Sequence, residues 1–271
     1  MTPGGEVVAL SPLVRRIVAP NPSAMTGAGT NTYLLGTTEV AVIDPGPDDP
    51  THLDAIVRAV GDGRLRWVLL THTHSDHAPG APPLARQTGA PLLAIWSRNP
   101  AVVVDRHLAD GETLEAAGYS LQALHTPGHA SNHLSFWLPE EQALFAGDLV
   151  MNGSTVVIAP PDGNMGAYLR SLERVRQRRA TRIYPGHGEP IENPDAVIDD
   201  YVKHRLMREQ QVLDALRAGP RRIADLVSLI YTGLPGSLHR MAALSVHAHL
   251  LKLEAEGKVS GADSDAEWSL A

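Results

Sequence analysis

A short apolar run, residues 67–70, leads directly into three histidines and one aspartate within six positions: His72, His74, Asp76 and His77. Imidazole nitrogens and carboxylate oxygens are common protein ligands of metal ions. Without a cation to bind them, four such groups in one loop would repel one another or point into solvent without a partner. We therefore expect a metal site here, provided that later loops supply the remaining ligands.

The composition limits the kinds of chain that this can be. The 271 residues are 43% hydrophobic and 20% charged, which is typical of a globular protein with one large domain or one large and one small. The absence of cysteine excludes disulfides, thiolate zinc sites and cysteine nucleophiles. A net charge of -7 gives no indication of non-specific nucleic-acid binding. Because no charged leader or long apolar stretch is present, we expect a cytoplasmic protein without a membrane partner.

Up to about residue 190 the chain alternates short β-like runs with turns and occasional helices. Helical spacing of apolar residues predicts helices over residues 48–60 and 165–176. The predicted strands are 7–10, 13–18, 31–35, 40–43, 67–70, 92–96, 120–124, 134–137, 143–146 and 182–184. Strands in hairpins interspersed with helices indicate an α/β (α+β) fold, an αββα sandwich of two sheets covered by helices.

After residue 194 the pattern changes to long helical runs, predicted at 195–217, 223–231 and 238–256, with a last strand candidate at 267–270. Helices followed by a small hairpin favour a winged-helix-like appendage. We therefore divide the chain into a catalytic domain, 1–194, and a C-terminal cap, 195–271. Residues 196–271 hold 9 Lys+Arg against 10 Asp+Glu, so the cap is not a basic DNA-reading module.

Further ligand candidates follow three later strands. His129, Asp148 and His187 each lie just after a predicted strand, next to a glycine that lets the backbone turn sharply. Strand-terminal loops are where a rigid sheet presents functional side chains. Together with the first loop, seven candidates are available, enough for two ions that each keep an open position for water. The sequence predicts a dinuclear metal site.

The motif His72-Thr73-His74-Ser75-Asp76-His77, followed by His129, Asp148 and His187, resembles the signature of the metallo-β-lactamase superfamily. The resemblance implies the αββα fold and a ligand assignment that spacing alone does not fix. It implies one ion bound by His72, His74 and His129, a second bound by Asp76, His77 and His187, and Asp148 as the bridge between them. Zinc is the first choice for this set, with iron or manganese as alternatives.

Several stretches resemble one branch of the superfamily, that of β-lactamase-like protein 2. Among them are residues 29–34 and residues 201–205. The superfamily holds several chemistries, so the substrate stays open. We expect hydrolysis of an ester, thioester or related carbonyl substrate; the alternative is endoribonuclease action on single-stranded RNA, against which the 4% aromatic content argues. An iron oxygenase and a binding module with structural metals are further rivals.

The expected mechanism is attack by a metal-bound hydroxide. Asp76 is expected to orient the hydroxide, and His133 to assist the developing oxyanion or the leaving group. Three further candidates are implied by the resemblance: Asp44 beside a histidine ligand, and Asn152 and Tyr168 along the pocket. Three roles stay open for the C-terminal cap: covering the cleft, binding nucleic acid, or forming the surface of a homodimer.

Overall fold

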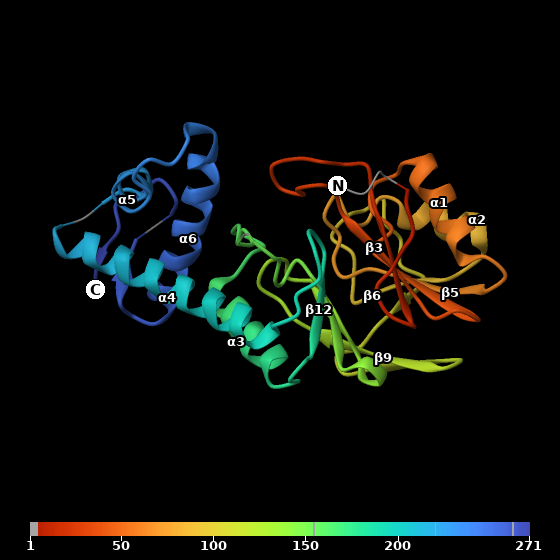
Figure 1. Ribbon diagram of the computed structural model, residues 1–271. Helices are drawn as coiled ribbons and strands as arrows, with labels where there is room; N and C mark the ends of the chain where they lie inside the picture. Colours follow the sequence, from red (N-terminus) through yellow and green to blue (C-terminus); the bar gives the residue numbers. More distant parts are fainter. Residues whose placement is uncertain (1–4, 154, 220, 262) are drawn as a thin grey trace.

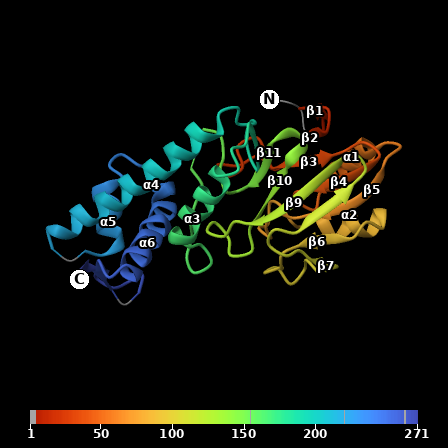
Figure 2. The ribbon, with the colours of Figure 1, turned by 90° about the horizontal axis from the view of Figure 1, so that it is seen from below.

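The structure, a computed structural model, describes residues 5–153, 155–219, 221–261 and 263–271. Figure 1 shows a larger part built on two β-sheets and a smaller helical part that ends the chain. Seen from below in Figure 2, the long helix α4 (Pro194–Arg217) runs from one part into the other. The two parts are therefore joined by a continuous helix.

The first sheet has seven strands in chain order, β1 to β7. Strands β1 to β4 pair antiparallel, and β4 to β7 pair parallel. Their bounds are β1 (Val8–Ala9), β2 (Val14–Val18), β3 (Asn31–Leu35), β4 (Glu39–Ile43), β5 (Arg64–Leu69), β6 (Leu92–Ala94) and β7 (Arg106–His107). The strands predicted over residues 31–35 and 40–43 are present and pair antiparallel as β3 and β4.

The second sheet has five strands in the order β12-β11-β10-β9-β8. Only its edge pair, β11 with β12, is parallel. The bounds are β8 (Thr113–Ala116), β9 (Tyr119–His125), β10 (Leu134–Leu138), β11 (Ala143–Gly147) and β12 (Arg182–Pro185). A 3-10 turn (Pro139–Glu141) joins β10 to β11.

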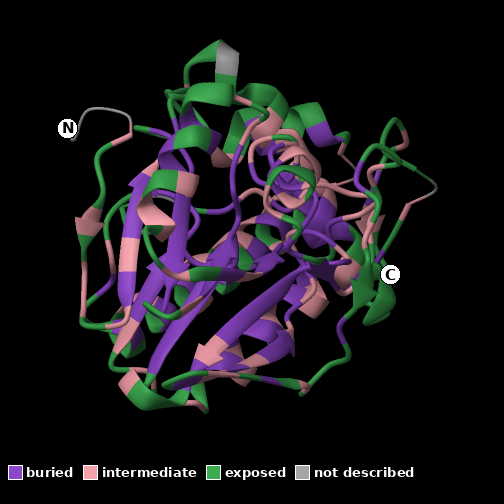
Figure 3. Ribbon diagram, turned by 90° about the vertical axis from the view of Figure 1, so that its right-hand side faces the viewer, coloured by how far each residue is buried: buried purple, intermediate pink, exposed green. Residues whose placement is uncertain are grey.

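Three apolar layers hold the larger part together. One lies between the sheets and takes side chains such as Tyr33, Leu121 and Phe136. A second lies between the first sheet and helices α1 (Pro50–Val60) and α2 (Ala81–Thr88), and a third joins the second sheet to α3 (Met165–Arg176). Figure 3 shows the central strands of the two sheets mostly in the colour of buried residues. This order of layers confirms the predicted αββα sandwich.

The alternation of side chains along β4 explains why the first sheet is buried on both faces. Ala41 and Ile43 enter the layer between the sheets, whereas Val40 and Val42 enter the layer under α1 and α2. Side chains of consecutive strand residues point to opposite faces. A strand covered on both faces therefore reads as a continuous apolar run.

Helix α2 and strands β7 and β8 do not follow from the sequence pattern. Helix α2 begins with Pro82 and Pro83 in its first turn, where proline is tolerated because that turn's N–H groups have no helical partner. The same prolines make the segment read as a loop. Strand β7 has only two residues, both exposed, so no hydrophobic pattern marks it.

The C-terminal part consists of α4, α5 (Ile223–Ile230), a 3-10 turn (Gly236–Leu238), α6 (His239–Ala255) and a hairpin of β13 (Val259–Ser260) with β14 (Ser269–Leu270). A separate core, centred on Trp268, fills it. Helix α4 contributes Ile198 and Tyr201 to the third layer and Val212 and Leu216 to this core. The division at residue 194 stays a prediction, because α4 belongs to both cores.

No helix among the described residues combines the length and apolar character needed to cross a membrane.

We predict that Phe136→Ala lowers the free energy of unfolding by about 3–5 kcal/mol, because it opens a cavity between the two sheets. Phe136 has no exposed surface. Urea denaturation followed by tryptophan fluorescence measures the change. Val103→Ala is the control, since that side chain is 75% exposed, and it should change stability by less than about 0.5 kcal/mol. Equal effects of the two substitutions would contradict the layer assignment.

Candidate metal centre

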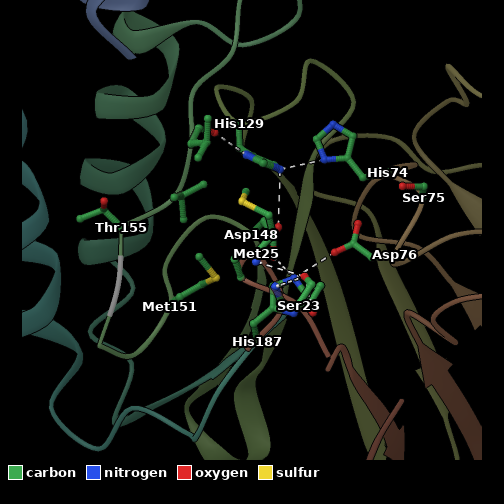
Figure 4. Close-up of a pocket in the computed structure, with 14 residues that line it drawn as sticks. Ser23, Met25, His74, Ser75, Asp76, His129, Asp148, Met151, Thr155 and His187 are labelled. Atoms are coloured by element: carbon green, nitrogen blue, oxygen red, sulfur yellow. Dashed lines mark hydrogen bonds and ion pairs between the residues drawn. The ribbon is translucent and has the colours of Figure 1, made fainter. Parts of the chain in front are cut away.

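All seven predicted ligands lie in loops that follow strands. Residues 71–77 follow β5, residues 126–133 follow β9, Asp148 follows β11, and His187 follows β12. Figure 4 shows the side chains labelled there, including His74, Asp76, His129, Asp148 and His187, pointing toward one another. The structure thus brings side chains as far apart in the chain as His77 and His187 into one site.

Three histidines form the first cluster. The Nδ1 atom of His74 lies 3.0 Å from Nε2 of His72 and 2.9 Å from Nε2 of His129. One ligand atom from each residue lies within 4.8 Å of the others. Three nitrogens that converge in this way offer a facial set of lone pairs to one cation.

Two aspartates and two histidines form the second cluster: Asp76, His77, Asp148 and His187. The Nε2 atoms of His77 and His187 are 3.2 Å apart, and Asp76 Oδ2 lies 3.1 Å from His187 Nε2. Asp148 lies between the clusters: Oδ1 is 3.4 Å from both histidines of its own cluster, and Oδ2 is 3.5 Å from Nε2 of His129. A carboxylate in that place can contact two neighbouring cations.

The second ring nitrogen of each of three ligands is bound to an oxygen. His77 Nδ1 donates to Asp44 Oδ2 at 2.9 Å, His129 Nδ1 donates to the Val157 carbonyl at 2.7 Å, and His187 Nδ1 donates to the Gly29 carbonyl at 3.2 Å. A ring that donates from Nδ1 keeps the Nε2 lone pair free. Such outer hydrogen bonds fix the tautomer and the orientation of a metal ligand.

The donor set fits metal ions. In the first cluster, the imidazole nitrogens of His72, His74 and His129 face one another at about hydrogen-bond distance. In the second, Asp148 Oδ1 is buried and accepts no hydrogen bond. Buried polar atoms normally have partners, so these groups call for a cation. A pair of divalent ions would satisfy both.

The two clusters differ in charge preference. Burial and the charges of neighbouring histidines lower the pKa of His74 to about 4 and hold the pKa of His72 well below its usual value. Burial also disfavours the charged form of His187, but the facing carboxylates of Asp148 and Asp76 outweigh it and raise its pKa to about 9. Burial opposes the charged form of His77 too, and the carboxylates around that ring outweigh it and raise its pKa. The rings of His77 and His187 in the second cluster therefore hold protons more readily than those of His72 and His74 in the first.

The structure places Asp44 against the second cluster. Its carboxylate accepts hydrogen bonds from the Thr71 amide, the Thr71 hydroxyl and His77. The residue is buried and has a positive φ of 51°, a strained conformation for a side chain other than glycine. The resemblance implied a place beside a histidine ligand, and that is where Asp44 lies.

His133 lies behind the site and not in it. It is fully buried, its Nε2 accepts the Asp148 amide N–H at 3.1 Å, and its Nδ1 is 2.9 Å from Thr126 Oγ1. With Nε2 used as an acceptor, the ring has no free N–H for an oxyanion or a leaving group. The geometry therefore favours a role for His133 in positioning Asp148. It does not favour the predicted role as a catalytic residue.

Asn152 and Tyr168 do not line the cavity, in contrast to what the resemblance implied. Asn152 is exposed, and its amide donates a long hydrogen bond, 3.5 Å, to the Pro190 carbonyl. Tyr168 is fully buried in the third apolar layer, where its hydroxyl donates to the Leu149 carbonyl. Both residues follow Asp148 in the chain, but packing turns them away from it.

The cavity over the clusters has a volume of about 440 Å³. Beyond the ligands it is lined by the loop of residues 23–26 and by Met151 and residues 155–157. The sequence pattern does not identify the wall residues Met25 and Val157. An isolated apolar side chain in a loop carries no periodic pattern, so only the fold shows that it faces the site.

Comparison with known proteins agrees with this geometry. Residues 25–187 match the family model described as the metallo-beta-lactamase superfamily, and residues 223–268 match a beta-lactamase associated winged helix domain. A beta-lactamase-like protein 2 homolog from Caenorhabditis elegans is 32% identical over 260 residues, with 92% of this chain and 87% of that protein covered.

Two further similar proteins are a curated relative named as a thioesterase and a solved crystal structure. An atrochrysone carboxyl ACP thioesterase from Aspergillus chevalieri is 37% identical over 246 residues, with 88% of this chain and 77% of that protein covered. The crystal structure of a metallo-beta-lactamase family protein from Thermus thermophilus is 25% identical, covers 97% of this chain and 100% of its own, and superposes with a TM-score of 0.79.

The fold and the two clusters define a metal-binding αββα protein with a winged-helix appendage. The chain belongs to the metallo-beta-lactamase superfamily, as its motif resemblance indicated. Together with relatives named as thioesterases and a His/Asp site able to hold metal, this makes it a metal-dependent hydrolase.

We predict that metal binding at the second cluster releases protons. His187, with its pKa raised to about 9, is protonated at pH 7 in the metal-free protein, and a metal ion must displace that proton. The apparent metal affinity of this cluster should therefore rise as the pH rises from 7 to 9, whereas the first cluster should change little. Calorimetric titration with Zn²⁺ in two buffers of different ionisation enthalpy measures the protons released.

His72→Ala is the matched variant for this titration, since it weakens the first cluster and leaves the four ligands of the second. If Zn²⁺ binds to His72→Ala at pH 7 without releasing protons, His187 is not protonated in the metal-free protein and the prediction is wrong.

Proposed function

We propose that this chain is a dinuclear zinc hydrolase of an ester, thioester or related carbonyl substrate. The observation that carries the proposal is the pair of adjacent clusters with Asp148 between them, at the floor of one cavity. His72, His74 and His129 would hold one ion, and Asp76, His77 and His187 the other. Zinc suits nitrogen and carboxylate ligands, and iron or manganese could bind to the same set.

Bound there, a metal pair supplies an activated water as nucleophile and positive charge that polarises the scissile carbonyl. The residues of the chain determine where this happens. Asp76 is partly exposed at the cavity and pairs with His187, so its second oxygen is available to orient a water. Asp44 and the carbonyls of Val157 and Gly29 fix the ligand rings, which pre-organises the site before substrate arrives.

The walls of the cavity favour an acyl substrate over RNA. Ala24, Met25, Met151 and Val157 give the wall an apolar surface. Among the described lining residues there is no lysine or arginine. A nucleic-acid site requires cationic side chains along the backbone and aromatic rings for stacking, and this cavity supplies neither. An uncharged acyl group fits these walls, in keeping with the relatives named as ACP thioesterases.

The predicted cytoplasmic location and homodimer stay predictions. The C-terminal winged-helix domain is close to neutral, which favours a structural role for it over nucleic-acid binding.

We predict that Asp148→Ala loses metal and activity together, because that carboxylate contacts both clusters. The as-purified protein should hold about two zinc ions per chain by elemental analysis. It should hydrolyse a thioester or aryl ester in a panel that also holds a cephalosporin and a fluorescent single-stranded RNA. In Asp148→Ala we expect at least one ion to be lost and turnover to fall by about 10²-fold or more.

Asp110→Ala is the control, since that aspartate is exposed and pairs with Arg174 away from the clusters. Full activity in Asp148→Ala would refute the mechanism. Cleavage of RNA alone, abolished in His72→Ala, would establish the ribonuclease alternative, and one iron without hydrolysis would indicate an oxygenase.

A second prediction concerns acyl-chain length. Met25 is 52% exposed at the cavity, in a tight turn held by the Ser23–Gly27 backbone bridge and by Ser23 Oγ, which accepts the Met25 N–H at 3.1 Å. Met25→Ala should lower kcat/KM for a hexanoyl thioester by roughly tenfold and leave an acetyl thioester nearly unchanged, because only the longer chain reaches this apolar wall. Met207→Ala, which removes a similarly exposed methionine on α4, should change neither substrate. Equal losses for both thioesters would exclude an acyl contact.

A further inference from the structure

The wall of the cavity that carries residues 155–158 is a segment without regular secondary structure, and hydrogen bonds join it to the metal site on one side and to α4 on the other. Its side chains alternate: Val156 and Ile158 are buried in the third apolar layer, whereas Thr155 is exposed at the cavity. Its backbone carbonyl groups also find partners on both sides. The segment can therefore accept hydrogen bonds from both sides.

Two neighbouring carbonyls of this segment are used in just this way. The Val157 carbonyl accepts the Nδ1–H of His129 at 2.7 Å, on the side of the metal site. The Val156 carbonyl accepts a hydrogen bond from the guanidinium of Arg205, on the side of α4. One peptide unit thus separates an arginine of the C-terminal helix from a metal ligand.

Arg205 is held firmly for a charged residue. Only 3% of it is exposed, and its guanidinium carbon lies 5.4 Å from the centre of the Tyr168 ring. Tyr168 in turn donates to the Leu149 carbonyl, next to Asp148. Burying an arginine is costly unless its contacts are specific, so this placement indicates more than a surface charge.

Tyr201, one helical turn before Arg205, holds the other end of the same wall. Its hydroxyl accepts the Met151 N–H and donates to the Met151 carbonyl, both at 3.0 Å. The ring is buried, and burial raises the pKa of Tyr201 to about 12, so the hydroxyl keeps the proton that it donates. Met151 lines the cavity. Side chains of α4 therefore hydrogen-bond to the backbone of the wall at two residues, Met151 and Val156.

We propose that Arg205 is a positioning residue for the first metal ion. Its hydrogen bond fixes the Val156 carbonyl, and this fixes the neighbouring Val157 carbonyl that orients His129. A C-terminal helix thereby sets the orientation of a metal-site residue in the larger part of the chain. The proposal rests on the proposed metal function, in that the cluster of His72, His74 and His129 must bind an ion. Arg205 is free for this role because Glu209, one turn later on α4, pairs with Lys252 on α6 at 2.8 Å.

The test is a titration of the metal-free protein with Co²⁺, followed by visible absorption. In Arg205→Met we expect the affinity of one of two ions to weaken by about 10- to 100-fold, the usual effect of losing an outer hydrogen bond to a ligand, while the other ion binds as in the wild-type protein. Arg205→Lys, which keeps a donor, should recover part of the loss. Because no substrate is present, failure of the proposed hydrolysis and failure of this proposal give separate results.

Arg208→Met is the matched control on the same helix. Arg208 donates to the Ile230 carbonyl at 3.3 Å and lies 4.3 Å over the Tyr231 ring, so it makes the same kinds of contact within the C-terminal part alone. It should bind Co²⁺ like the wild-type protein even if its melting temperature falls as much as that of Arg205→Met. Unchanged titration in Arg205→Met, or equal weakening in both variants, would overturn the proposal.

Tyr201→Phe provides a milder second variant, since it removes only a hydroxyl. Met151 lines the cavity, and in the described structure its backbone hydrogen bonds go to Tyr201 and to no cluster residue, so we expect KM to rise with Co²⁺ affinity unchanged. A loss of Co²⁺ affinity equal to that of Arg205→Met would show that the whole wall fails together and would refute the specific role of the Val156 carbonyl.

Discussion

The site depends on the hydrogen bonds that the Asp44 carboxylate accepts, because they connect this carboxylate to both clusters. It accepts the N–H of His77 directly, and it accepts the hydroxyl of Thr71, whose oxygen lies 3.0 Å from Nδ1 of His72. One buried group thus orients a ligand in each cluster. The backbone of Asp44 is strained, with a φ of 51°, and the carbonyl of that residue accepts a hydrogen bond from Thr32. Strain of this kind persists only where the surrounding structure fixes it, as here between two buried strands.

The close approach of the strands explains why glycines flank the ligands. A Cβ atom on Gly147 would lie 2.7 Å from both Nε2 of His133 and Cβ of Thr71, and one on Gly186 would lie 2.5 Å from Asp148 Oδ1. Both distances are shorter than any ordinary contact. Any larger residue at these two positions would therefore displace Asp148 or the groups that hold it. The ligand loops can meet only because the backbone carries no side chain where they cross.

The residues of the two clusters could be picked out from the sequence because each lies in a polar loop that follows an apolar strand, and polar groups gathered at strand ends favour a common partner. The layers could be predicted because β4 and the end of β5 read as continuous apolar runs. Asp44 was placed only through the resemblance, since an aspartate after a strand also forms turns. His133, Asn152 and Tyr168 show the limit. His133 follows His129 in the chain and the other two follow Asp148, but which way each side chain points depends on packing that the local sequence does not encode.

The C-terminal part shows the same limit from the opposite direction. Its helices and hairpin follow from their own pattern, so the sequence treats it as a separate unit with a separate core. Helix α4 belongs to both parts of the chain, because its first half packs in the third layer and brings Tyr201 and Arg205 to the cavity wall. The wall has no regular secondary structure of its own, so its backbone carbonyls need donors from elsewhere. A loop with few internal hydrogen bonds can orient a metal ligand only if a rigid element holds it, and α4 is the rigid element within reach.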